Sequence, residues 1–71
     1  METNIRRKLG KRIKELRTAK ELTQEKLAEA AGIDYKYLQR IEGKTPPSLK
    51  IDTIDRIAKA LEINPSKLLD F

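Results

Sequence analysis

The stretch LTQEKLAEAAGIDYKYLQRIEG, Leu22 to Gly43, holds two short apolar patterns separated by one glycine, Gly32. Within each pattern the apolar residues recur at intervals of three and four, which is the spacing of one helix face. Glycine reaches the left-handed backbone conformation without a Cβ penalty, so it commonly ends a helix. The stretch therefore predicts a helix over residues 24–31, a tight turn, and a second helix over residues 34–42 at a wide angle to the first.

One local frame marks three helix starts in this chain. An apolar residue precedes a Thr, Asp or Asn, and a second apolar residue follows after three further positions. The polar side-chain oxygen can accept from unpaired N–H groups, and the apolar pair fixes the angle at which the chain enters the helix. The three sites are Leu22-Thr23…Leu27, Ile33-Asp34…Leu38 and Ile63-Asn64…Leu68. Pro65 then occupies the first helical position, where its missing N–H has no cost.

Helical periodicity also covers the two remaining segments. A helix over about residues 4–20 is interrupted only by the poor helix former Gly10, and its apolar face consists of Ile5, Leu9, Ile13 and Leu16. The apolar face of a fourth helix consists of Ile51, Ile54, Ile57, Ala58 and Leu61. No segment alternates with period two. We therefore expect an all-α chain of five helices that forms a single domain, residues 1–71.

Charge indicates the kind of partner. The 16 Lys and Arg residues exceed the 11 Asp and Glu residues, which gives a formal net charge of +5. Residues 1–22 carry 8 basic and 3 acidic side chains, whereas the later residues are balanced. A basic segment beside a neutral body suggests a polyanion partner, either nucleic acid or an acidic membrane surface. The same net charge is also compatible with an ordinary solvated surface.

Composition excludes several classes of protein. The chain has no Cys and no His, so it lacks thiolate and imidazole metal ligands and the usual nucleophile–base pairs. Its longest apolar runs are far too short for a membrane span. Asp52 and Asp55 form a carboxylate pair at i and i+3, but no partner group supports acid–base catalysis. We expect no metal, no cofactor, no small-molecule ligand, no membrane association and no enzymatic activity.

The second helix of the opening stretch presents a polar face. Leu38 and Ile41 should point inward, with Asp34 near the same side. The outward residues are expected to be Lys36, Gln39 and Arg40, flanked by Tyr35 and Tyr37. Lys and Arg can donate to guanine, Gln can pair with adenine, and Tyr can contact a thymine methyl group or a phosphate. Tyr37 is equally suited to cover the edge of the core.

The spacing Gln24-x3-Ala28-x3-Gly32-x5-Leu38-x2-Ile41-Glu42 closely resembles the helix-turn-helix of the lambda repressor and Cro-like (XRE-type) family. The segments RIKELRTAKELTQEKLA and IAKALEINPSKLL are similar to the first two and last two helices of that family, so the resemblance covers about residues 5–70. It implies a compact five-helix domain whose third helix enters the major groove of double-stranded DNA. The segment RIEGKTPPSLKID departs from the pattern, because Gly43 follows Glu42 directly and the next loop is longer.

The chemistry of the outward face and the resemblance together assign roles to side chains. Base contacts are expected from Tyr35, Lys36, Gln39 and Arg40. Backbone contacts are expected from Thr23, Gln24, Tyr37, Lys44 and Thr45. The resemblance implies that Gln24 reaches a phosphate, and a helix N-terminus suits that anion. It also implies a structural ion pair between Arg17 and Glu42 that ties the first helix to the third.

These features favour a cytoplasmic, nucleoid-associated transcriptional regulator that binds a palindromic operator as a homodimer. Near the C-terminus, Leu68, Leu69 and Phe71 fit the core, although Phe71 could also lie at a dimer contact. A protein-interaction module with the same fold is the main alternative, and it should carry an acidic or apolar third helix instead of a basic one. The chain could also be the DNA-binding domain of a longer ligand-regulated protein.

Overall fold

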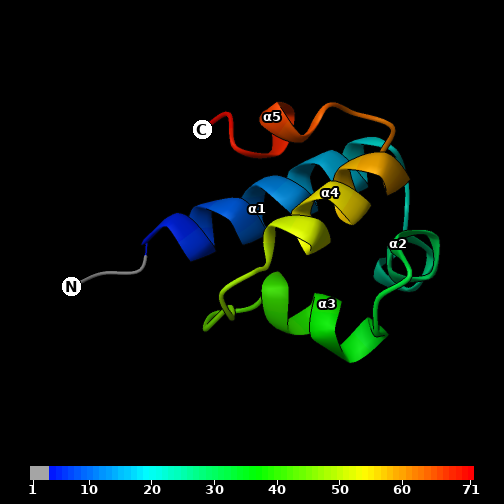
Figure 1. Ribbon diagram of the computed structural model, residues 1–71. Coiled ribbons are helices and arrows are strands. Elements are labelled where there is room, and N and C mark those ends of the chain that lie inside the picture. Colours follow the sequence, from blue (N-terminus) through cyan, green and yellow to red (C-terminus); the bar gives the residue numbers. More distant parts are fainter. Residues whose placement is uncertain (1–3) are drawn as a thin grey trace.

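The computed structural model describes residues 4–71, and within that range it contains five helices and no strand (Figure 1). The helices are α1 (Asn4–Ala19), α2 (Gln24–Ala31), α3 (Tyr35–Ile41), α4 (Ile51–Ala60) and α5 (Pro65–Leu68). The predicted all-α architecture is therefore confirmed. The helix predicted over 34–42 is one residue shorter at each end, because Asp34 and Glu42 are its cap residues.

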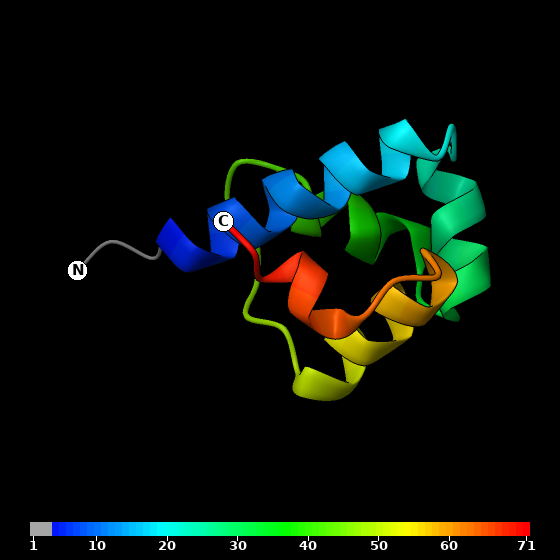
Figure 2. The same ribbon diagram turned by 90° about the horizontal axis from the view of Figure 1, so that it is seen from above.

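The helices are arranged so that α3 lies at one side of the molecule. Figure 1 places α3 and α5 on opposite sides, with α1 and α4 between them. Seen from above, α1 runs along the molecule beside α5 (Figure 2). The Arg12 Nε donates to the carbonyl oxygen of Lys67 at 2.9 Å, which fastens α5 to α1. Helix α2 packs against both α3 and α4, so it links the α3 side to the rest of the molecule.

One hydrophobic core joins the five helices. Its largest fully buried side chains are Ile13, Leu27, Leu38, Ile41, Ile57, Leu61 and Leu68. Full burial of such a side chain contributes roughly 1.5–3 kcal/mol. The apolar residues that precede the three predicted caps are partly buried against this core, and they are Leu22, Ile33 and Ile63. The repeated frame in the sequence therefore marks the places where each helix enters the core.

Four apolar residues that fit the core by sequence are exposed instead. Ile51 is 73% exposed and Ile5 is 63% exposed, and Leu69 and Phe71 are also exposed. Ile51 is the first residue of α4, where Lys50 is the N-cap, and burial along this helix begins only at Ile54. Ile5 lies in the first turn of α1, before the buried part of that helix begins. Helical spacing identifies the face of a helix, but it does not show where along the helix the core ends.

The turn between α2 and α3 has the predicted geometry. Gly32 is left-handed, with φ of 68°, and the Ile33 N–H donates to the Ala28 carbonyl oxygen at 3.0 Å. Glu21 and Glu62 follow α1 and α4 in the same left-handed conformation, each with φ of 59°. A side chain in this conformation is strained relative to glycine. The sequence frame did not predict these two turns, because their central residue is Glu.

The side-chain caps are present at two of the three predicted starts. Thr23 Oγ1 accepts from the Lys26 N–H at 3.0 Å, and Asn64 Oδ1 accepts from the Ser66 N–H at 3.0 Å. Asp34 has the extended backbone of an N-cap, but its carboxylate accepts no capping bond and is exposed. The expectations that Asp34 caps through its side chain and lies near the inward side are therefore wrong. Its extended backbone still starts the helix.

Gly10 lies where α1 crosses the end of α3. A Cβ atom at this position would overlap the carbonyl oxygen of Ile41. The residue is fully enclosed although it has no side chain to bury. Glycine therefore lets the backbones of α1 and α3 approach closely. This packing offsets the cost of glycine inside a helix, which is about 1 kcal/mol relative to Ala.

Candidate nucleic-acid interface

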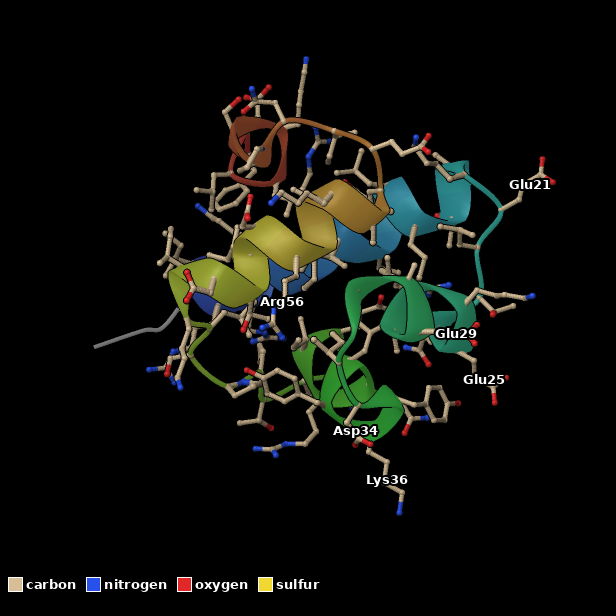
Figure 3. The ribbon with its side chains drawn as sticks, turned by 45° about the vertical axis from the view of Figure 1, so that its right-hand side comes forward. Glu21, Glu25, Glu29, Asp34, Lys36 and Arg56 are labelled. Carbon is tan, nitrogen blue, oxygen red and sulfur yellow. The ribbon has the colours of Figure 1, made fainter. Side chains whose placement is uncertain are left out.

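The exposed side of α3 carries the polar residues that the helical spacing placed outward. Lys36, Gln39 and Arg40 are exposed, whereas Leu38 and Ile41 are buried in the core. We call Lys36, Gln39 and Arg40 the reading face. The Lys36 side chain projects away from the body of the molecule (Figure 3). Two cations and one carboxamide on a short exposed helix can donate to base edges and phosphates at once.

The two tyrosines of α3 differ in environment. Tyr35 is 39% exposed, and its hydroxyl oxygen accepts a hydrogen bond from the Gln39 Nε2 at 3.0 Å. Tyr37 is partly buried and packs against the core. Tyr35 therefore belongs to the exposed side of α3, while Tyr37 lies at its boundary with the core.

Arg17, Glu42 and Gln24 form a buried cluster that we call the polar clamp. Arg17 donates from Nε to Glu42 Oε2 and from Nη2 to Glu42 Oε1, both at 2.9 Å. The Glu42 side chain is only 2% exposed and that of Arg17 only 10%, so the pair is shielded from water. Gln24 Nε2 adds a third hydrogen bond to Glu42 Oε1 at 3.0 Å. Arg17 Nη1 also donates to the Leu22 carbonyl oxygen at 2.7 Å.

The polar clamp holds the two helices of the turn in a fixed relation. Gln24 is the first residue of α2, and Glu42 is the C-cap of α3. Their hydrogen bond joins the outer ends of the helices, while Gly32 joins the inner ends. Arg17 comes from α1 and neutralises Glu42, so the carboxylate does not leave an unpaired charge beside α3. The sequence suggested Arg17 and Glu42 through resemblance, but the bond from Gln24 was not foreseen.

The remaining predicted backbone contacts lie around this cluster. Thr23 is exposed at the N-cap of α2, and Gln24 is half-buried with its amide nitrogen turned to Glu42. Each Gln amide has two N–H groups, so one remains free for a phosphate. Lys44 and Thr45 are exposed in the loop that follows α3, and the buried Pro46 anchors that loop.

A basic hollow that sequence reasoning missed lies beside Lys44. This open hollow, about 330 Å³ in volume, is lined by Lys44, Gly43 and Glu42 and by three cations of α1, Arg7, Lys11 and Lys14. Because Arg17 already neutralises Glu42, the hollow presents four cations. The sequence does show that the N-terminal third of the chain is basic. It does not show that α1 packs against α3, which brings those cations to the loop.

The outer side of α2 has the opposite charge. Glu21, Glu25 and Glu29 are exposed and extend along this side of the molecule (Figure 3). We call these three residues the acidic flank. Within residues 4–71 none of them forms an ion pair. A polyanion is therefore attracted to one side of the helix pair and repelled by the adjacent side.

The chain matches the family described as the Cro/C1-type HTH DNA-binding domain over residues 12–71. The chain belongs to the Cro/C1-type helix-turn-helix family. Within this family, α2 and α3 are the helix-turn-helix, and α3 is the helix that reads DNA. The protein is accordingly a DNA-binding transcription regulator.

Several similar proteins are control or controller proteins, and two of those with solved structures are controllers of restriction–modification systems. The chain is 38% identical to the control protein C.BamHI of Bacillus amyloliquefaciens, with all of this chain and 88% of that protein aligned. The crystal structure of the restriction–modification controller protein C.AhdI from Aeromonas hydrophila is 40% identical, covers 89% of this chain and 94% of its own, and has a TM-score of 0.84. The chain is also 30% identical in sequence to C.Esp1396I, which has been solved bound to a 25 base pair operator site. That match covers 97% of this chain and 90% of C.Esp1396I, with a TM-score of 0.87.

No helix in the described range is both long enough and apolar enough to cross a membrane. Among residues 4–71 there is also no group of three or more His, Cys, Asp or Glu side chains placed to bind a metal ion.

Proposed function

We propose that this chain is a controller-type transcription regulator that inserts α3 into the major groove of operator DNA. The observation that carries the proposal is the reading face, three exposed polar residues on a helix whose other side is locked into the core. In this arrangement Lys36 and Arg40 donate to guanine, Gln39 faces adenine, and Tyr35 lies beside them at the N-terminal end of α3. The similarity to two restriction–modification controllers, C.AhdI and C.Esp1396I, and to the control protein C.BamHI supports the biological setting.

Phosphates on either strand would meet the groups that surround the groove. We assign backbone contacts to Thr23 and Gln24 at the start of α2, to Tyr37 on α3, and to Lys44 and Thr45 in the loop. The basic hollow extends this surface along α1 and offers a place for one further phosphate. Such contacts fix the position of the protein on the duplex without carrying sequence information.

We propose that the protein acts as a homodimer on a palindromic operator. Exposed apolar side chains support this, since Ile5 and Leu69 line one apolar groove together with Pro46, Pro47 and Leu49. Ile51 and Phe71 are exposed as well. A single small domain gains limited affinity, and joining two copies raises it because the second half-site is then bound in an intramolecular step. Two copies related by a two-fold axis would meet half-sites about 34 Å apart.

We further propose that the 71 residues act as one DNA-binding domain without catalysis, in the cytoplasm and associated with the nucleoid. Regulation would follow from the position of the bound dimer relative to polymerase. The sequence has no Cys and no His, and the functional surface is an open helix face rather than an enclosed pocket.

Selection from random duplexes tests the proposal directly. We expect enrichment of a two-fold symmetric sequence, together with an affinity that falls with salt at roughly −0.9 in log K per log salt for each phosphate contact. Sedimentation of the protein with and without the selected duplex would establish the dimer. The proposal fails if no sequence is enriched or if the affinity does not respond to salt.

A further inference from the structure

The hydrogen bond between Tyr35 and Gln39 lies on the exposed side of α3. The two residues are at i and i+4, which makes them neighbours on one side of a helix. Gln39 Nε2 donates to the Tyr35 hydroxyl oxygen at 3.0 Å, and both side chains are exposed. Gln39 is flexible on its own, with several rotamers of similar energy. The bond to Tyr35 selects one of them before any ligand arrives.

This bond decides which groups of Gln39 remain free. One amide N–H is used by Tyr35, which leaves one N–H donor and the carbonyl oxygen as an acceptor. A donor beside an acceptor is the pattern complementary to the major-groove edge of adenine, whose N7 accepts and whose N6 amino group donates. Guanine presents two acceptors there and would leave the Gln39 carbonyl oxygen without a donor. The Tyr35 hydroxyl keeps its own hydrogen for an acceptor such as a phosphate oxygen.

We propose that Tyr35 is a positioning residue for Gln39, and that the pair reads an adenine as one unit. This inference rests on the proposed function, since it assumes that α3 lies in the major groove. Tyr35 sets the orientation of the carboxamide, and Gln39 makes the contact that distinguishes the base. Lys36 and Arg40 read separately, because no hydrogen bond connects them to this pair in the described range.

The test uses the full chain and the duplex that selection returns. Base preference is measured at every position of the half-site, by competition, for four proteins: the unaltered chain, Tyr35→Phe, Gln39→Ala and the double variant. Gln39→Ala identifies the base pair that Gln39 reads, which we expect to be A·T. Tyr35→Phe keeps the ring and removes only the hydroxyl. We expect it to reduce the preference at that same base pair by about threefold to tenfold.

Two further measurements separate positioning from direct contact. In the double variant the loss of preference should equal that of Gln39→Ala alone, because Tyr35 acts through Gln39. Replacing the adenine by 7-deazaadenine removes N7, and it should weaken the unaltered protein more than either single variant. Ser66→Ala is the control, since it removes an exposed hydroxyl from α5, on the side of the molecule opposite α3 (Figure 1), and should leave the preference at this base pair intact. All variants should melt close to the unaltered chain.

The outcomes distinguish the two proposals. If no duplex is enriched, the proposed function fails and the role of the pair fails with it. If a duplex is enriched and Tyr35→Phe keeps the full preference, only the pairing proposal is overturned. It is also overturned if the base pair is not A·T, or if Tyr35→Phe still changes the preference once Gln39 is alanine.

Discussion

The two helices of the turn are similar in length and opposite in the charge they expose. Helix α2 carries Glu25 and Glu29 of the acidic flank, and α3 displays the reading face with its two cations. Both helices bury an apolar side in the same core, so amphipathic spacing describes them equally well. The difference shows that spacing identifies an exposed helix face, whereas the charge on that face indicates what it can approach. A duplex is drawn to α3 and pushed away from the outer side of α2.

The polar clamp is what allows the two helices to present different faces at a fixed angle, and breaking it should have the largest effect. Glu42→Ala removes the acceptor of three hydrogen bonds and leaves the Arg17 guanidinium unpaired in a buried position. We expect a loss of about 3–5 kcal/mol in the free energy of unfolding, measured by urea titration. Glu15→Ala removes a carboxylate from the exposed pair with Arg12 and should cost less than about 1 kcal/mol. Equal costs for the two variants would show that burial does not matter here.

Removing the two cations of the reading face should reduce the preference for the operator over scrambled DNA. Lys36→Ala and Arg40→Ala should each weaken binding to the preferred operator by about 1–3 kcal/mol and barely change binding to scrambled DNA. Lys44→Ala should weaken both duplexes by similar factors, because a phosphate contact carries no base information. Competition binding at one fixed salt concentration measures this. If both α3 variants kept their full base preference, α3 would not be the reading helix.

Glu21 sharpens the comparison, because it contributes to the acidic flank and also forms a left-handed turn. Glu21→Gly relieves the strain of a side chain at φ of 59° and should raise stability by about 1 kcal/mol. A gain of that size raises the melting temperature of a small domain by roughly 4–8 °C. Glu21→Gln removes the charge and keeps the strain, so it should bring no such gain. An equal rise for both variants would assign the effect to charge.

Neutralising the rest of the acidic flank should have the smallest effect. Combining Glu25→Gln and Glu29→Gln should increase the affinity for random duplexes by about 0.5 kcal/mol at low salt, since exposed charges outside the interface act only through a screened field. The slope of log K against log salt should not change, because no new phosphate contact forms. If the slope changed by roughly 0.9, the amount expected for one phosphate contact, the outer side of α2 would lie against the duplex.

Much of the fold could be predicted because local chemistry determines it. Gly32 and the caps at Thr23 and Asn64 act on groups a few residues away, and the structure reproduces them. The exposure of Ile51 could not be predicted, because it depends on where the core ends. The periodicity of α1 alone shows Gly10 only as a poor helix former, because it does not reveal that the end of α3 crosses α1 at this position.

The candidate site divides in the same way. Helical spacing places Lys36 and Arg40 outward without any knowledge of tertiary structure. The bond from Gln24 to Glu42 joins residues 18 positions apart, and it required the helix pair to be assembled. The basic hollow required α1 to be placed beside the loop that carries Lys44. Contacts between elements were therefore inaccessible to reasoning about one element at a time.

The close crossing at Gly10 has a consequence for the DNA itself. The end of α3 is held to α1 at two points, by backbone approach at Gly10 and by the pair of Arg17 with Glu42. A helix fixed in this way cannot rock to follow an irregular groove, so adaptation falls to the duplex. Base steps that bend or narrow easily would then be preferred even where no side chain touches them. A rigidly held α3 would therefore favour operators that deform easily over stiffer ones.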